Sequence, residues 1–317
     1  MVTVMFDKGL DPVAERRRKK AQGITVREAL EAHVRSLRKK GGSPRSEEDL
    51  RYCIEHYLGD WAGRALMSIT REECRARHHR ISEENGPYVA NRTLRCLRAI
   101  WHSAAKVHQE IPRDAPTIGC EWNKQRRRRQ PLRWATLPAW RARIEALGEL
   151  RRDYLLFVAL TGLRSEDAAT VRYADADFES GTLHRPRPKG GEDRAFTIPI
   201  AEAALEIIRR RREANGTADY VFATKDLKGN VTPIVERRWG KKGESPHRLR
   251  DTFITAALQV GIPLYEVKVL VNHRLPDGGD TTLGYSNPEL EHLRAQVERV
   301  AAFLLGKMTT SANVGQA

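Results

Sequence analysis

The sequence is poor in several features that would place it in well-defined classes of protein. It has only four cysteines, Cys53, Cys74, Cys96 and Cys120, and no Cys-x-x-Cys pair. A disulfide framework or a zinc ribbon needs closer spacing, so these residues indicate reduced, structural thiols and no metal site. The longest apolar runs, such as residues 154–160, are far too short to cross a bilayer, and the N-terminus lacks a signal peptide's apolar core. We therefore expect a cytoplasmic protein without a membrane partner.

Acidic residues are scarce relative to basic ones. The 41 Asp and Glu residues stand against 56 Lys and Arg, which gives the 317-residue chain a net charge of +15. Much of the excess is arginine, whose guanidinium matches phosphate geometry, and neutralising phosphates releases counterions. The balance favours nucleic acid as the partner, and a merely soluble basic protein is the alternative. The length allows two domains with separate cores.

Helical periodicity dominates residues 25–110. Apolar positions recur at steps of three and four over residues 25–40, and Ser-Glu-Glu-Asp at Ser46 indicates the capped start of a second helix. A third helix is expected after Thr70, and the longest over about residues 88–108. These patterns predict a compact helical domain.

Basic residues step along one side of the long helix and then accumulate beyond it. Arg92, Arg95 and Arg98 could contact phosphates there, and a solvated charged face is the alternative. Residues 111–134 lose the helical pattern and are predicted to be an interdomain linker. Adjacent like charges repel one another unless an anion is near, so we expect this linker to lie across a DNA backbone. Its four consecutive arginines are Arg126, Arg127, Arg128 and Arg129.

The most unusual stretch is residues 245–287. It reads Ser-Pro-His-Arg-Leu-Arg-Asp-Thr-Phe, an apolar segment, Val-Asn-His-Arg, and finally Thr-Thr-Leu-Gly-Tyr-Ser-Asn. Ser245 before a proline predicts a helix start with a capping hydroxyl, which places His247 and Arg250 on one face, near N–H groups that favour an anion. Lys241 and Lys242 lie just before this stretch.

A second imidazole, His273, and the phenol of Tyr285 follow within the same stretch. A tyrosine hydroxyl titrates near pH 10, so it becomes a nucleophile at neutral pH only where cations or a base favour loss of its proton. A phosphodiester is the anionic partner that such a group fits. Taken alone, each residue is as well explained as an ordinary surface or core side chain, and only their joint order indicates a site.

Two further patterns belong to the same half of the chain. A helix ending at Thr161-Gly162 is followed by Leu-Arg164, with Asp167 three residues further on. Short strands at residues 182–184 and 196–200 flank the hairpin tip Pro-Lys189-Gly-Gly. An ordinary i,i+3 ion pair and a turn lysine without a role are the alternative interpretations.

Together these motifs resemble the tyrosine recombinases, the phage integrase family, of the prophage or genomic-island type. The resemblance rests on Thr-Gly-Leu-Arg, His-x-x-Arg, Asn-His and Gly-Tyr, and residues 25–110 are similar to the family's core-binding domain. It implies a mainly α fold with a small β-hairpin or sheet, in which the helical domain and an α+β catalytic domain over residues 135–306 form a clamp. Residues 1–24 are similar to the exit from an arm-binding domain that the chain lacks, or are a basic leader, and residues 307–317 are expected to be a mobile tail.

The resemblance also implies a mechanism without metal, nucleotide or other cofactor. Tyr285 would attack the scissile phosphate and form a 3′-phosphotyrosyl bond. Arg164 and Arg250 would hold the non-bridging oxygens, and Asp167 would support Arg164 by a charge-assisted hydrogen bond. His247 would act as general base, Lys189 as general acid to the 5′-oxygen, and His273 as a hydrogen-bond donor.

The implied partners are double-stranded DNA attachment sites and three further copies of the chain, as a homotetramer on DNA with a free protein that can be monomeric. Excision and host DNA-bending factors are additional candidates, and a bacterial nucleoid is the implied location. His273 and Tyr285 are twelve residues apart, a few more than the commonest family spacing. The final helix is expected to pack on its own domain or on a neighbouring protomer. A type IB topoisomerase and a non-catalytic DNA-binding accessory protein are the alternative functions.

Overall fold

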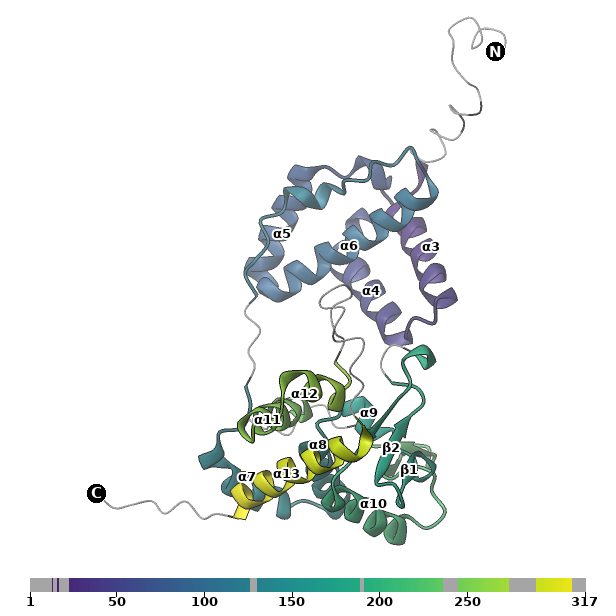
Figure 1. The fold of residues 1–317 in the computed structure, drawn as a ribbon. Coiled ribbons are helices and arrows are strands. Elements are labelled where there is room, and N and C mark those ends of the chain that lie inside the picture. Colours follow the sequence, from purple (N-terminus) through teal and green to yellow (C-terminus); the bar gives the residue numbers. More distant parts are fainter. Residues whose placement is uncertain are drawn as a thin grey trace, which may run out of the picture. The chain divides into compact units, whose positions relative to one another are not determined.

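A computed structural model describes residues 23–125, 130–188, 191–235, 245–273 and 289–309, together with Val13 and Arg16. The chain divides into two compact units, Met1–Arg127 and Arg128–Ala317 (Figure 1). Helices make up most of the described part of both units, and small antiparallel sheets occur in the second. This confirms the predicted mainly α fold with a small β component. No helix within the described residues is long and apolar enough to span a membrane.

Residues 23–125, the continuous described stretch of the first unit, form four α-helices whose starts follow from local sequence. Thr25 and Thr70 each form a capping box with the glutamate three residues later, so both predicted starts are confirmed. The second helix begins earlier than predicted, because Ser43 accepts a hydrogen bond from the N–H of Ser46 and a proline fills the first helical position. The helices are α3 (Val26–Lys39), α4 (Pro44–Tyr57), α5 (Arg71–Asn85) and α6 (Pro87–Val107), with 3₁₀ turns at Gly59–Trp61, Leu66–Ser68 and Pro116–Gly119.

The core of this unit extends beyond the predicted boundary at residue 110. Ile111, Ala115 and Cys120 are buried in it, and the 3₁₀ turn packs against α5 and α6. The prediction of a linker from residue 111 was therefore wrong for its first part. Proline and glycine removed the helical periodicity that the prediction relied on, although the segment still buries its apolar side chains.

A buried polar network fixes the end of this segment. The fully buried side chain of Asn91 donates to the backbone carbonyl of Asn123 at 2.8 Å and accepts from its N–H at 3.1 Å. His78 Nε2 lies 2.8 Å from Asn91 Oδ1, and Asn123 Nδ2 donates to Ser82 Oγ at 2.9 Å. Each of these buried polar groups thus finds a partner, as the low dielectric requires.

The second unit surrounds α8 (Glu149–Thr161), which is buried over residues 153–161. It packs against α10 (Glu202–Asn215) and α11 (Pro246–Gln259). A three-stranded antiparallel sheet of order β1-β2-β3 pairs Leu183 with Ile198, both buried, and a two-stranded sheet β4-β5 follows. The strands are β1 (Ala176–Asp177), β2 (Thr182–Arg185), β3 (Phe196–Pro199), β4 (Ala223–Lys225) and β5 (Val231–Pro233), and the other helices are α7 (Leu137–Glu145), α9 (Ser165–Ala169), α12 (Leu264–Leu270) and α13 (Leu290–Thr309).

The final helix, α13, packs on its own unit. It lies beside α7 and α8 in Figure 1 and also contacts α11 and β3. Its buried stripe includes Val297, Val300 and Leu304. Glu298 accepts from the N–H of Glu202 at 2.7 Å, at the N-terminus of α10, which has no side-chain cap of its own. Of the two arrangements left open by the sequence, this is packing in cis.

Candidate active site

The first arginine of the candidate site follows a turn that only glycine can make. Gly162 ends α8 in the left-handed conformation at φ +63°, and a Cβ there would lie 2.4 Å from the ring of Phe253. The turn sends Leu163 into the core and brings Arg164 to the start of α9. The Thr-Gly-Leu-Arg pattern therefore has a steric origin.

The second arginine, Arg250, comes from the second turn of α11 and is 5% exposed. Its Nη1 donates to the carbonyl of Gly162 and its Nη2 to the carbonyl of Val271, both at 2.7 Å. These carbonyls lie at the C-terminal ends of α8 and α12, where the helix dipole favours a cation. The remaining N–H groups of this guanidinium are not used by these two bonds.

The end of α12 also holds the first arginine. Arg164 Nη2 donates to the carbonyl of Asn272 at 3.0 Å. Asn272 has φ +44°, and the N–H groups of Asn272 and His273 bond back to the carbonyls of Val269 and Lys268. This is the Schellman arrangement that closes a helix with a left-handed residue. The C-terminal ends of α8 and α12 and the N-terminal end of α9 thereby meet at two guanidiniums.

The electrostatics of the pair are unusual. Burial lowers the pKa of Arg250 to about 10, and the neighbouring charge of Arg164 acts in the same direction. The nearby carboxylate of Asp167 is buried, and its Oδ2 lies 3.7 Å from Arg164 Nη1. At that distance the two groups form an ion pair, but these two atoms are too far apart for the charge-assisted hydrogen bond that the resemblance implied. Two adjacent cations held by neutral carbonyls form a local excess of positive charge that an anion would relieve.

The two histidines lie at the edges of this arrangement. His247 is exposed in the first turn of α11, one turn before Arg250, and His273 is exposed directly after Asn272. Ser245 occupies the N-cap as predicted, but its hydroxyl makes no capping hydrogen bond. The expected capping hydroxyl was wrong, because Pro246 already removes one donor and the cap is made by backbone geometry alone.

Several predicted site residues lie outside the described residues. The candidate nucleophile Tyr285 and the candidate acid Lys189 are among them, so their predicted roles stay predictions. The structure brings Arg164, Arg250 and the turn carrying His273 together. The sequence analysis included Gly162 and Asn272 only as members of the Thr-Gly-Leu-Arg and Asn-His motifs and did not predict their left-handed conformations, although glycine or asparagine directly after a helix signals such a cap. The predicted DNA-contact residues that also lie outside the described ranges are Arg126, Arg127, Arg128, Arg129, Lys241 and Lys242.

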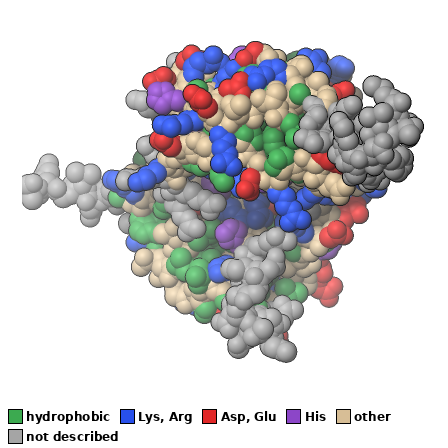
Figure 2. Space-filling model, turned by 90° about the horizontal axis from the view of Figure 1, so that it is seen from above, with side chains coloured by type: hydrophobic (Ala, Val, Ile, Leu, Met, Phe, Trp, Pro, Cys, Tyr) green, Lys and Arg blue, Asp and Glu red, His purple; other side chains and the backbone are tan. Residues whose placement is uncertain are grey.

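The three arginines of α6 differ in their availability. Arg92 forms an ion pair with Asp49 at 2.5 Å, and Arg95 lies over the Trp122 ring at 5.7 Å. Arg98 is exposed. On the face drawn in Figure 2, Lys and Arg side chains lie next to Asp and Glu side chains over much of the upper part. Phosphate contact by the α6 arginines stays a prediction, and Arg92 would have to exchange a carboxylate for a phosphate to make it.

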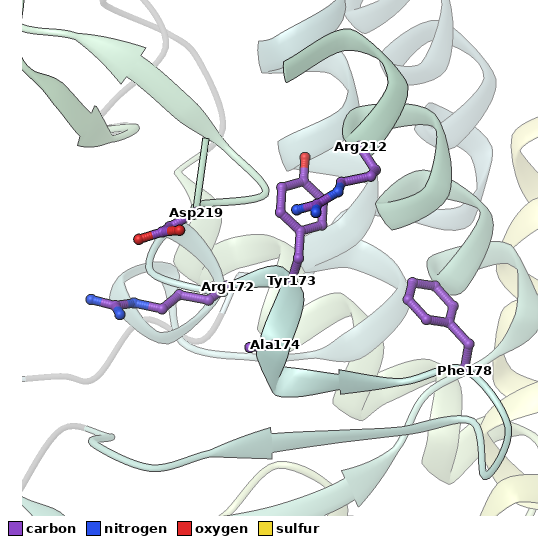
Figure 3. A pocket seen from close by; sticks show the side chains of 6 residues that line it. All are labelled: Arg172, Tyr173, Ala174, Phe178, Arg212 and Asp219. Atoms are coloured by element: carbon purple, nitrogen blue, oxygen red, sulfur yellow. The ribbon is translucent and has the colours of Figure 1, made fainter. Parts of the chain in front are cut away.

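A pocket elsewhere in the same unit as the arginine pair combines a phenol with arginines. Figure 3 shows an open pocket in which the Arg212 guanidinium lies over the ring of Tyr173, 4.6 Å from its centroid. Burial raises the Tyr173 pKa, and its hydroxyl accepts a hydrogen bond from Asn215 at 2.9 Å. A raised pKa disfavours the phenolate, so this pocket does not provide an activated tyrosine. The pocket is lined by Arg172, Tyr173, Ala174, Phe178, Arg212 and Asp219.

Comparison with known proteins gives matches to one family over the second unit. Residues 141–277 match the phage integrase family, a range that contains the two arginines and both histidines of the site and ends before Tyr285. The chain is 32% identical over 160 residues to the tyrosine recombinase XerA of Pyrococcus furiosus, an alignment that covers 47% of this chain and 54% of the relative. It is 29% identical over 161 residues to the tyrosine recombinase XerC of Oceanobacillus iheyensis, covering 45% and 52%. The chain thus spans about half the length of the curated relatives it matches.

Solved structures are similar over most of the chain. A lambda integrase tetramer bound to a Holliday junction superposes with a TM-score of 0.61 at 18% identity, covering 86% of this chain and 84% of the other. The Tn1549 transposon integrase in complex with transposon right end DNA gives 0.60 at 17% identity, covering 88% and 100%. At these identities the similarity is one of fold.

Proposed function

We propose that this chain, whose residues 141–277 match the phage integrase family, is a site-specific DNA recombinase that cleaves and rejoins DNA through a 3′-phosphotyrosyl intermediate. The observation that carries the proposal is the pair of guanidiniums of Arg164 and Arg250, fixed at the meeting point of three helix ends. The family match over residues 141–277 supports the same function.

The arginine pair fits the electrostatics of phosphoryl transfer. Charge builds up on the non-bridging oxygens as the nucleophile approaches phosphorus, and fixed donors aimed at those oxygens lower the barrier without reorganising. Backbone carbonyls hold both guanidiniums before any DNA binds. The scissile phosphate would then add negative charge to a site where one buried carboxylate, Asp167, faces two cations.

The remaining steps are assigned to residues at the edges of this pair. The Tyr285 oxygen attacks phosphorus and loses its proton to His247, while the bond from phosphorus to the 5′-oxygen breaks and Lys189 supplies the leaving group's proton. His273 donates a hydrogen bond to the phosphate. The phosphotyrosyl bond conserves the energy of the phosphodiester, so the 5′-hydroxyl of another strand can reverse the step without ATP or a metal ion.

The proposed substrate is a pair of double-stranded attachment sites, and the proposed working state is a homotetramer on DNA. Exchange between two duplexes requires two cleavages on each, and each protomer supplies one tyrosine. The lambda integrase in the similar structure is a tetramer on a Holliday junction. We propose the same assembly for this chain, formed from a monomeric free protein, with excision and host bending factors as accessory partners in a bacterial nucleoid.

Covalent capture tests the proposal directly. The protein is incubated with a pool of nicked duplexes randomised over the core site, and adducts that resist denaturant are isolated and sequenced. We expect an adduct for the wild type, none for Tyr285→Phe, and an unchanged yield for the control Tyr265→Phe on α12. A chelator should leave the yield intact.

The same experiment separates the alternative functions. Binding of the pool without any adduct would refute the recombinase and favour the accessory DNA-binding protein. An adduct accompanied by relaxation of supercoiled plasmid, with no exchange between two captured duplexes, would favour the type IB topoisomerase. An adduct formed by Tyr285→Phe would refute the nucleophile assignment.

A further inference from the structure

A single residue outside the proposed reaction steps shapes the backbone on which the site depends. Among the described residues other than glycine, Asn272 alone has a positive φ, at +44°. A Cβ disfavours this conformation, and asparagine tolerates it better than the other residues that carry one. Within the described part of the chain, its side-chain amide makes no hydrogen bond that would give it another role.

The left-handed conformation determines the path of the chain at the end of α12. It allows the N–H of His273 to reach the carbonyl of Lys268 at 2.8 Å and the N–H of Asn272 to reach that of Val269 at 2.9 Å. These bonds close the helix and turn the next two peptide units out of its axis. A residue that preferred a negative φ would continue or unwind the helix instead.

The two carbonyls released by this turn are the ones that hold the arginine pair. The Val271 carbonyl accepts from Arg250 at 2.7 Å and the Asn272 carbonyl from Arg164 at 3.0 Å. The next residue in the chain is His273. One turn of three residues therefore serves as the common support for groups that come from three different elements.

We propose that Asn272 is a positioning residue, whose left-handed conformation aims these two carbonyls at Arg164 and Arg250 and presents His273 beside them. The proposal rests on the proposed function for its catalytic consequence. It requires the backbone conformation and not the amide group, so glycine should replace asparagine and a β-branched residue should not.

The test compares Asn272→Gly with Asn272→Val, and uses Gly261→Val as a matched control. Gly261 follows α11 with φ +81°, and a Cβ at this position would meet no other atom within 4 Å, so valine there introduces comparable backbone strain away from the arginines. All variants are assayed for single-turnover adduct formation well below their melting temperatures. We expect Asn272→Val to slow the covalent step by roughly ten- to thirtyfold, with unchanged non-covalent DNA binding.

Asn272→Gly should stay within about threefold of the wild type, and Gly261→Val should lose stability but keep its rate. In an Arg164→Ala background, the valine substitution should slow the covalent step by a smaller factor than in the wild type, because one of the three groups that the turn supports is already absent. Wild-type rate in folded Asn272→Val would overturn the proposal. An equal loss in Asn272→Gly would also overturn it, because the amide group would then be required.

A second readout does not depend on recombination. Sulfate bound by two aligned guanidiniums should raise the melting temperature of the wild type and of Asn272→Gly, and should raise that of Asn272→Val by much less. If the wild type forms no adduct, the proposed function fails, yet this comparison still decides the role of Asn272. Equal sulfate stabilisation of all three proteins would refute the positioning role.

Discussion

Replacement of Arg250 by alanine tests the electrostatic basis of the site. Burial and the charge of Arg164 lower the Arg250 pKa from its ordinary value to about 10. One pKa unit corresponds to about 1.4 kcal/mol, so the folded protein holds this cation at a cost of about 3 kcal/mol. An anion placed between the two guanidiniums would recover most of that energy. The gain is largest in the transition state, where the negative charge on the phosphate oxygens is greatest.

This magnitude sets the expected effect on the reaction. If the phosphate gains about 3 kcal/mol from Arg250 in the transition state, Arg250→Ala should slow adduct formation by about a hundredfold. The assay is single-turnover formation of the denaturant-resistant adduct on the captured duplex. The matched control is Arg248→Ala, which removes a cation from the same helix. The Nε of Arg248 donates to the Gln130 carbonyl at 2.7 Å.

The same substitution should change stability much less than activity. Removal of the buried cation relieves about 3 kcal/mol, whereas the carbonyls of Gly162 and Val271 each lose a hydrogen bond worth about 1 kcal/mol, and a cavity remains. We therefore expect the free energy of unfolding to change by about 1–2 kcal/mol at most.

The pH dependence has a definite sign. The folded pKa of Arg250 is lower than its unfolded value, so the cost of the charge is fully present below pH about 10 and declines as pH rises above it. The stability difference between wild type and Arg250→Ala should therefore be constant from roughly pH 6 to 9, as measured by urea denaturation. An Arg250→Ala variant that forms the adduct at a rate within threefold of the wild type would refute the electrostatic role of Arg250. An Arg248→Ala variant that forms the adduct as slowly as Arg250→Ala would refute it as well.

Two further substitutions test the structural supports. Gly162→Ala places a Cβ 2.4 Å from Phe253 at a residue with φ +63°, so we expect a loss of about 3 kcal/mol or more in urea denaturation; an unchanged midpoint would show that the turn can rearrange. Asn91→Ala removes both bonds to the Asn123 backbone, and should destabilise the first unit by about 2–4 kcal/mol. For Asn91→Ala, hydrogen exchange should become faster at residues 111–125 and change little in the second unit. Unchanged slow exchange at residues 111–125 would contradict the anchoring role of Asn91.

The sequence by itself determined the local elements, because their signals act over a few residues. Threonine and glutamate three positions apart fixed the starts of α3 and α5, and the apolar stripe of α6 recurs at the helical period. The bounds of the two strands that flank residues 186–195 were predicted within one residue. β-Branched and aromatic residues lie on both sides of a tip rich in turn-forming residues. The order of Arg164, His247, Arg250 and His273 predicted one site, and the structure brings Arg164 and Arg250 to carbonyls at the end of the same helix.

Only the tertiary structure decided what holds that site together. Arg164 is anchored 108 residues away in sequence and Arg250 88 residues away, and both partners are backbone carbonyls, which every residue possesses and no sequence pattern marks. The same holds for residues 111–125, which lack periodicity yet pack into the first core, and for α13, whose apolar stripe fits any matching surface. Local propensity sets backbone angles, whereas the meeting of three helix ends depends on how whole elements pack.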